Sequence, residues 1–304
     1  MTRIKSLALT SAAAMALAAP ALAQEAAIDF TLVGVAPLGN GYTYEGWAIV
    51  GGEPVSTGRF IVNDEGLALD TDGNPLPGGV MALGDVEPAS VEAVVLTIEP
   101  ANDPDPAPSA AKYLGGPVVD GTAQLTTSFD GAFGTDFGAA FGTYILATPS
   151  NGMDSDELAG IWWLEPQSPA DMDAGLSLPD LPEGWVYEGW AVIDGTPVST
   201  GRFTSVLEAD DFAGFSGDEA TPPFPGEDFL ANAPEGMTFP ANLQGAMAVI
   251  SVEPADDDDP APFAIKPLAG AIPADAEPGT VYEMDNKSGG LPSGTATFVT
   301  ASNG

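Results

Sequence analysis

The chain has 304 residues, with 7 Lys and Arg residues against 44 Asp and Glu residues, so the formal net charge is -37. It contains no His and no Cys. These two absences exclude disulfides, zinc sites of the usual nitrogen or sulfur kind, and catalytic triads that need an imidazole. A surface with so few cations also repels phosphates, so we expect no nucleic-acid partner.

The first 23 residues have the pattern of a secretory signal peptide. Arg3 and Lys5 form a charged start, an apolar stretch covers 7–19, and Ala21-Leu22-Ala23 provides a small-residue cleavage site. The apolar stretch is shorter than the roughly 20 residues that a membrane span needs. We therefore expect a mature chain that starts at Gln24, has no transmembrane segment, and is periplasmic or secreted.

The first half of the mature chain consists of short predicted strands. Runs rich in β-branched and aromatic residues lie at 30–35, 42–50, 55–62, 91–98 and 143–148, bounded by Gly and Pro. The turn residues from Gly51 to Pro54 predict a hairpin between the second and third runs. Helical periodicity is nearly absent, which favours an antiparallel β-sandwich.

The second half repeats the first. Segment 44–60 recurs at 187–203 with 13 of 17 residues identical, and segment 97–118 recurs at 251–272 with 12 of 22 identical. A third segment, GTYILATPSNG at 142–152, returns more loosely as GTATFVTASNG at 294–304. We therefore predict an all-β protein of two tandem, immunoglobulin-like β-sandwich domains, at 24–152 and 153–304, each with its own core.

The second unit is longer than the first. The offset between the copies is 143 residues at the first repeated segment and 154 at the second, so about eleven residues are inserted between them. The run 208–236, which is rich in Asp, Gly and Pro, is the predicted place of this insertion and is expected to be a loop.

The hairpin of the first unit predicts an ion pair. A turn about Gly52 places Glu45 opposite Arg59 and Trp47 opposite Thr57. Gly46 would face a second glycine, leaving a strip of bare backbone on which an aromatic ring such as Tyr44 or Phe60 could lie.

The second copy of the hairpin repeats the pattern, with Glu188 opposite Arg202 and Trp190 opposite Thr200. Four of the five cations left after signal removal fall at equivalent positions, the two Arg residues and the pair Lys112 and Lys266. We interpret the Arg residues as members of structural ion pairs, and recognition of an anionic group by Arg is the alternative.

Acid-rich loops are candidate calcium sites, because Ca²⁺ prefers six to eight oxygen ligands. Asp70, Asp72 and Asn74 begin like a calcium-binding loop, but Met81 stands where an EF-hand needs Glu. A second candidate is the run Asp256, Asp257, Asp258 and Asp259, whose counterpart in the first unit is 102–105. The competing interpretation of both loops is a solvated turn without metal.

The repeated motifs resemble a known family. The pattern of Tyr44, Trp47 and Ile49, then Pro54-Val55-Ser56 with Gly58 and Phe60, and later Ile98-Glu99-Pro100-Ala101 is similar to the extracytoplasmic C-terminal domain of anti-sigma-K factors of the RskA type. The second unit repeats it at Tyr187, Trp190, Val192, Pro197-Val198-Ser199, Gly201, Phe203 and Val252-Glu253-Pro254-Ala255. The resemblance covers about two thirds of each unit. It implies a detached, duplicated form of a β-rich sensory domain without catalytic residues.

These observations favour a non-enzymatic extracytoplasmic binding or sensor module, with envelope signalling as the process that the resemblance suggests, whose partner is a protein or a small ligand outside the cytoplasm. The alternative is an acidic structural or calcium-binding surface or secreted protein. A hydrolase that uses only carboxylates is a third hypothesis, since such chemistry needs no His.

Overall fold

A computed structural model describes residues 26–39, 41–152, 155–168, 171–257 and 259–300. The predicted signal peptide and Asp258 lie outside these residues. The described part consists of strands, loops and short 3-10 turns, and every strand pairing in it is antiparallel. The predicted all-β class is therefore confirmed, whereas the immunoglobulin-like arrangement stays a prediction.

The strands of the first half include two long hairpin strands and a long central strand. They are β1 (Ala26–Val33), β2 (Tyr42–Val50), β3 (Glu53–Val62), β4 (Ala68–Leu69), β5 (Met81–Ala82), β6 (Val91–Pro100), β7 (Lys112–Val119), β8 (Thr122–Leu125) and β9 (Phe141–Leu146). Three 3-10 turns accompany them, η1 (Pro77–Gly79), η2 (Pro88–Ser90) and η3 (Pro149–Asn151).

The second half has the same long hairpin and several shorter strands. Its strands are β10 (Gly160–Trp162), β11 (Leu164–Ser168), β12 (Asp171–Ala174), β13 (Leu176–Ser177), β14 (Trp185–Ile193), β15 (Thr196–Phe203), β16 (Gly226–Asp228), β17 (Met247–Pro254), β18 (Ile265–Ala271), β19 (Tyr282–Glu283), β20 (Asp285–Asn286) and β21 (Ser293–Thr300). The turn η4 (Ser288–Gly290) precedes the last strand.

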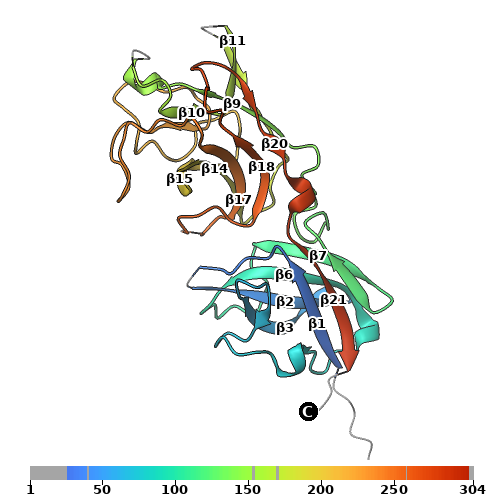
Figure 1. The fold of residues 1–304 in the computed structure, drawn as a ribbon. Coiled ribbons are helices and arrows are strands. Elements are labelled where there is room, and N and C mark those ends of the chain that lie inside the picture. The colour runs from blue at the N-terminus through green and yellow to red at the C-terminus, as the bar shows by residue number, and fades with distance from the viewer. Residues whose placement is uncertain (1–25, 40, 153–154, 169–170, 258, 301–304) are drawn as a thin grey trace, which may run out of the picture.

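The strands form two lobes (Figure 1). In the first lobe one sheet has the order β4-β3-β2-β6-β7-β8-β21-β1-β5, and it folds over so that β1 lies across β2. In the second lobe the sheets β15-β14-β17-β18-β20 and β13-β9-β10-β16 form the two layers, and β19 pairs with β9.

The sheets do not follow the boundary between the repeats. Strand β9 belongs to the first repeat but pairs with β10, β13 and β19 of the second. Strand β21 ends the second repeat but lies between β1 and β8 of the first, and Figure 1 shows it in red within the blue and teal lobe. Each lobe is therefore built from parts of both repeats, and neither repeat forms a sandwich from its own strands alone.

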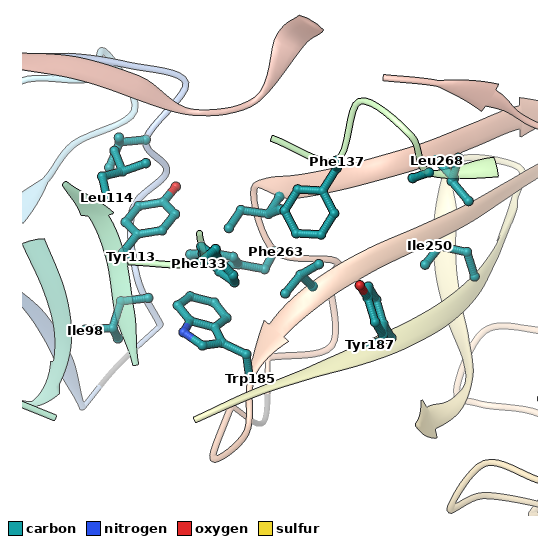
Figure 2. Packing of buried hydrophobic residues seen from close by; sticks show 14 of the residues in the cluster. Ile98, Tyr113, Leu114, Phe133, Phe137, Trp185, Tyr187, Ile250, Phe263 and Leu268 are labelled. Carbon is teal, nitrogen blue, oxygen red and sulfur yellow. The ribbon is translucent and has the colours of Figure 1, made fainter. Parts of the chain in front are cut away.

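The apolar core is likewise shared. One cluster of buried side chains runs from Ile98 and Tyr113 in the first lobe through Trp185 and Phe263 to Ile250 in the second (Figure 2). The ring centroids of Tyr113 and Phe263 lie 5.4 Å apart. The separate cores expected for the two units are thus joined in one large cluster, and a small second cluster contains Ile145, Ala147, Trp162 and Leu164.

The hairpin β2–β3 has the predicted ion-pair register and an irregularity beyond it. Glu45 lies opposite Arg59, but a bulge at Thr57 places Trp47 opposite Ser56, so the predicted pairing of Trp47 with Thr57 is wrong. The second hairpin has the same bulge, with Trp190 opposite Ser199. Both turns have two residues at positive φ, Gly51-Gly52 in the first and Asp194-Gly195 in the second, as a tight two-residue hairpin turn requires.

In each lobe an aromatic ring from the opposite layer packs over the hairpin glycine. The ring of Phe30 lies 3.1 Å from the place where a Cβ on Gly46 would stand, and Trp163 lies 2.7 Å from the equivalent place on Gly189. The rings come from β1 and from the residue after β10, not from Tyr44 or Phe60 as the sequence suggested. This contact packs the two layers of each lobe against each other.

Candidate functional site

Both predicted ion pairs are present. The Arg59 Nε lies 2.8 Å from Glu45 Oε2, and the Arg202 Nε lies 3.1 Å from Glu188 Oε2. The Arg side chains are about one quarter exposed, at 24% and 25%, and their partners are buried. Burial raises the pKa of Glu188 even though Arg202 and Ser199 pull it down, so the ion pair only partly offsets the desolvation of the carboxylate.

The Arg side chains also hold the loop that follows the Glu-Pro-Ala motif. Arg59 Nη1 donates to the carbonyl of Pro100 at 3.1 Å, and Arg202 Nη2 donates to the carbonyl of Asp257. Their guanidinium groups are therefore committed to protein partners. This geometry supports the structural interpretation over recognition of an anion.

A second repeated network explains the Glu of that motif. Trp47 Nε1 donates to Thr97 Oγ1 at 2.8 Å, and Thr97 in turn donates to the buried carboxylate of Glu99. In the second lobe Trp190 Nε1 donates to Ser251 Oγ at 2.8 Å and Ser251 donates to Glu253. Burial raises the pKa of Glu253 to about 7.

The calcium candidates are arranged as turns. Asp70 Oδ1 accepts the backbone N–H of Asp72 at 3.0 Å and of Asn74 at 2.7 Å, and these bonds lower the pKa of Asp70. Asp257 and Asp259 accept backbone N–H groups two residues ahead in the same way. Among the described residues no group of three or more acidic side chains is placed to hold a metal ion.

The insertion of the second repeat carries carboxyl groups that sequence reasoning did not single out. Asp228 accepts Trp162 Nε1 at 2.7 Å and the backbone N–H of Ser150 at 2.8 Å. Glu227 accepts the hydroxyl of Ser216, and Asp210 accepts the backbone N–H of Gly226 at 2.8 Å. Burial raises the pKa of Asp210 and of Glu227 to about 7. These bonds tie the insertion to the lobe.

A hollow lies between the lobes. It is a partly open cavity of about 190 Å³, lined by residues 36–39 and Tyr42 of the first lobe and by residues of the second lobe between Pro254 and Lys266, among them Asp257 and Asp259. Tyr42 at its rim donates its hydroxyl to the carbonyl of Asp256 at 2.7 Å. Tyr44 fixes the loop from below, because its hydroxyl donates to the carbonyl of Ala36 at 2.7 Å.

The two repeat-equivalent loops at the interface between the lobes differ in how closely they pack. The loop 179–185 is the counterpart of 36–42, and it packs closely on the first lobe: a Cβ on Gly184 would lie 2.7 Å from the carbonyl carbon of Ala110. At the equivalent Gly41 no described atom lies within 4 Å of such a Cβ. Gly184 is therefore packed closely against the opposite lobe, whereas its counterpart Gly41 has space beside it, and the chain next to Gly41 reaches the second lobe through the bond from Tyr42 to Asp256.

Aromatic residues fill the seated side. The Trp185 ring packs against Phe133, with 4.5 Å between ring centroids, and against Phe263 at 5.9 Å (Figure 2). Its counterpart Tyr42 lines the cavity on the other side. The hollow is thus a departure from the symmetry of the repeat rather than a consequence of it.

The cavity combines apolar walls with charges of both signs. Leu38, Ile98 and Phe263 contribute apolar surface, and Lys266, Asp257 and Asp259 line it as well. Lys266 Nζ donates to the carbonyl of Phe263 at 2.6 Å, and burial lowers the pKa of this ammonium group, with Glu253 opposing the effect. The repeat counterpart Lys112 is exposed.

Comparison of the chain with models of known protein families, with curated proteins and with solved structures finds no match. Among the described residues no helix is long and apolar enough to cross a membrane.

Proposed function

We propose that the chain is a non-enzymatic extracytoplasmic binding module that takes a small ligand into the cavity between its lobes. The observation that carries the proposal is the asymmetry of the two interface loops: Gly184 is packed closely against the opposite lobe, whereas its counterpart Gly41 has space beside it and a cavity is lined by residues 36–39 and Tyr42. Packing that is complete on one side of a repeat and open on the other favours a site that receives a ligand.

The lining favours a zwitterion with an apolar body. A carboxylate would accept a hydrogen bond from Lys266, which has three protons and donates one to Phe263. An ammonium group would lie near Asp257 and Asp259, and an apolar side chain would cover Leu38 and its neighbours. The strongly negative chain repels a purely anionic ligand, which favours a ligand that also carries positive charge. Hydrophobic amino acids and short hydrophobic peptides have this chemistry.

The resemblance of the repeats to the outer domain of anti-sigma-K factors supports a sensory role for such binding, because that domain lies outside the cytoplasm. Ligand capture between the lobes would be the event that is sensed, and envelope signalling is the process that the resemblance suggests. The repeated Trp and Glu networks give each lobe a rigid frame on which the interface loops are mounted.

Calorimetric titration with leucyl-leucine tests the proposal. We expect binding that weakens when either terminus of the dipeptide is blocked, by N-acetylation or by amidation. Lys266→Met should abolish the preference for a free carboxylate, whereas Lys112→Met, at the exposed repeat counterpart, should bind as the unchanged protein does. An affinity that is unchanged by blocking either terminus and by Lys266→Met would overturn the assignment of the cavity. The absence of binding by any hydrophobic amino acid or dipeptide would overturn it as well.

A further inference from the structure

The repeat shows that the two lobes have exchanged their last strands. Strand β1 pairs with β21 so that Ile28 lies opposite Phe298, and β10 pairs with β9 so that Ile161 lies opposite Leu146. The third repeated segment aligns Leu146 with Phe298. Strands β9 and β21 are therefore counterparts, and so are β1 and β10, yet each counterpart pairs with the strand of the other repeat.

Two independent contacts support this correspondence. Phe30 and Trp163 stand two residues after Ile28 and Ile161, and both lie over the equivalent hairpin glycines. On the far side of the exchanged strands, β8 pairs with β21 and β19 pairs with β9 at matching positions. The exchanged strand is thus an inner strand in both lobes, and its removal would leave open edges on each side.

The chain crosses between the lobes twice. Residues 126–140 lead from β8 to β9, and 287–292 lead from β20 to β21. Asn286 joins the two crossings, because its Nδ2 donates to the carbonyl of Phe137 at 2.9 Å and of Ala140 at 2.7 Å. Phe133, on the first crossing, is packed against Trp185 in the shared core.

We infer that the protein is a strand-exchanged pair fused into one chain, and that its last strand can complete the first lobe of a second copy. Strand β21 contributes eight paired positions to β1, from Ala26 opposite Thr300 to Val33 opposite Ser293. This backbone ladder is the same whether β21 comes from its own chain or from another, as in other strand-donating and domain-swapped assemblies. When β1 is not paired with β21 of its own chain, the partner that it fits is therefore β21 of another copy of this chain.

The absence of Cys allows a direct test with engineered disulfides. Thr31 and Thr295 lie opposite each other, and facing residues of antiparallel strands are close enough for a disulfide. The single variants Thr31→Cys and Thr295→Cys are mixed, unfolded together in guanidinium chloride, refolded and oxidised. We expect a disulfide-linked heterodimer whose yield rises with protein concentration, and none when the folded proteins are mixed without unfolding.

Cysteine pairs at positions that do not face each other serve as controls. Thr31→Cys refolded with Thr204→Cys, an exposed position in the second lobe, should give no specific heterodimer.

In single chains, Thr31→Cys with Thr295→Cys should form an internal disulfide, and Thr31→Cys with Thr143→Cys should not, because Thr143 is the repeat counterpart of Thr295 in the other lobe. Asp29→Cys with Thr297→Cys or with Ile145→Cys repeats this comparison at a second facing pair. Internal linkage to Thr143 or Ile145 would show that each repeat closes on itself. Failure of the Thr31 and Thr295 variants to link between chains at any concentration would overturn exchange with a second copy.

Discussion

The two lobes differ most at the edge strand beside β1 and β10. Met81 of β5 lies opposite Ile28, and Glu227 of β16 lies opposite Ile161. Met81 and Glu227 therefore occupy equivalent positions, one with an apolar side chain and the other with a carboxyl group. Both are buried, at 6% and 0% exposure.

The difference extends to the neighbouring hairpin glycine. A Cβ on Gly58 would meet Met81 at 3.0 Å, whereas at its counterpart Gly201 the nearest atom belongs to Asp210, at 2.5 Å. The insertion supplies both Asp210 and the partners of Glu227. The same sheet arrangement therefore accepts an apolar or a carboxylic side chain at its edge, provided that the inserted loop supplies hydrogen-bond donors for the carboxyl groups.

Removal of strand β9 should have the largest effect, because it should abolish cooperative unfolding of the second lobe. A fragment of residues 153–304 lacks β9, the inner strand between β10 and β19, and should show no cooperative thermal unfolding by circular dichroism. A fragment of residues 138–292 retains β9 and should unfold cooperatively. Cooperative unfolding of 153–304 as a monomer would mean that the second repeat folds from its own strands after all.

The ion pairs are the point at which the lobes agree, and they should respond alike. Arg202→Met leaves Glu188 buried without its cation and should cost about 3–5 kcal/mol in the free energy of unfolding. Arg59→Met should cost a similar amount, since its geometry is the same. The double variant Glu188→Gln with Arg202→Met should lose less than Arg202→Met alone. Additive effects in urea titrations would show that Glu188 and Arg202 are not coupled.

Making the first lobe resemble the second should destabilise it. Met81→Glu places a carboxyl group at the edge of β5 without the hydrogen bonds that Ser216 and the insertion give to Glu227, so we expect a loss of about 2–3 kcal/mol. Met81→Leu keeps the apolar volume and is the control, with a loss of less than about 1.5 kcal/mol. Equal urea midpoints for the two variants would contradict the importance of the inserted partners.

A pH dependence of stability should also distinguish the lobes, because the edge of the second lobe carries buried carboxyl groups. The ordinary pKa values of Asp210 and Glu227 are 3.8 and 4.5, and burial raises both to about 7. Between these values the folded protein holds protons that the unfolded chain has released, so its stability should fall as the pH rises from about 4 to about 7 and level off above that. Burial also raises the pKa of Asp228 and Glu253, which act in the same direction.

Asp210→Asn isolates the contribution of the insertion. This variant should flatten the decline of the melting temperature between pH 4 and pH 7, while Met81→Leu should leave it unchanged. A steeper decline in Asp210→Asn than in the unchanged protein would show that the carboxyl group is not held protonated in the folded state.

Local patterns in the sequence determined the strands but only part of the hairpin register. Alternating aromatic and β-branched residues between Gly and Pro turns specify strands, and a two-residue turn fixes which residues face each other next to it. The turn at Gly51-Gly52 alone would place Glu45 opposite Gly58, and the extra residue of the bulge at Thr57 shifts the pairs beyond it, so that Glu45 faces Arg59. A turn centred on Gly52 predicts the same ion pair but misplaces Trp47, because one extra residue on a strand leaves no local pattern from which the bulge could be predicted.

Contacts between distant segments were decided only by the tertiary structure. Because β9 and β21 have related sequences, the repeat alone cannot tell which of them pairs with β1 and which with β10. The structure pairs β1 with β21 and β10 with β9, and Asn286 at the end of β20 is bonded to Phe137 and Ala140 of the segment that leads to β9. The cavity beside Lys266 has the same origin: Gly41 and Gly184 are equivalent in the repeat, and only the packing against the opposite lobe shows that one of them has space beside it and the other has none.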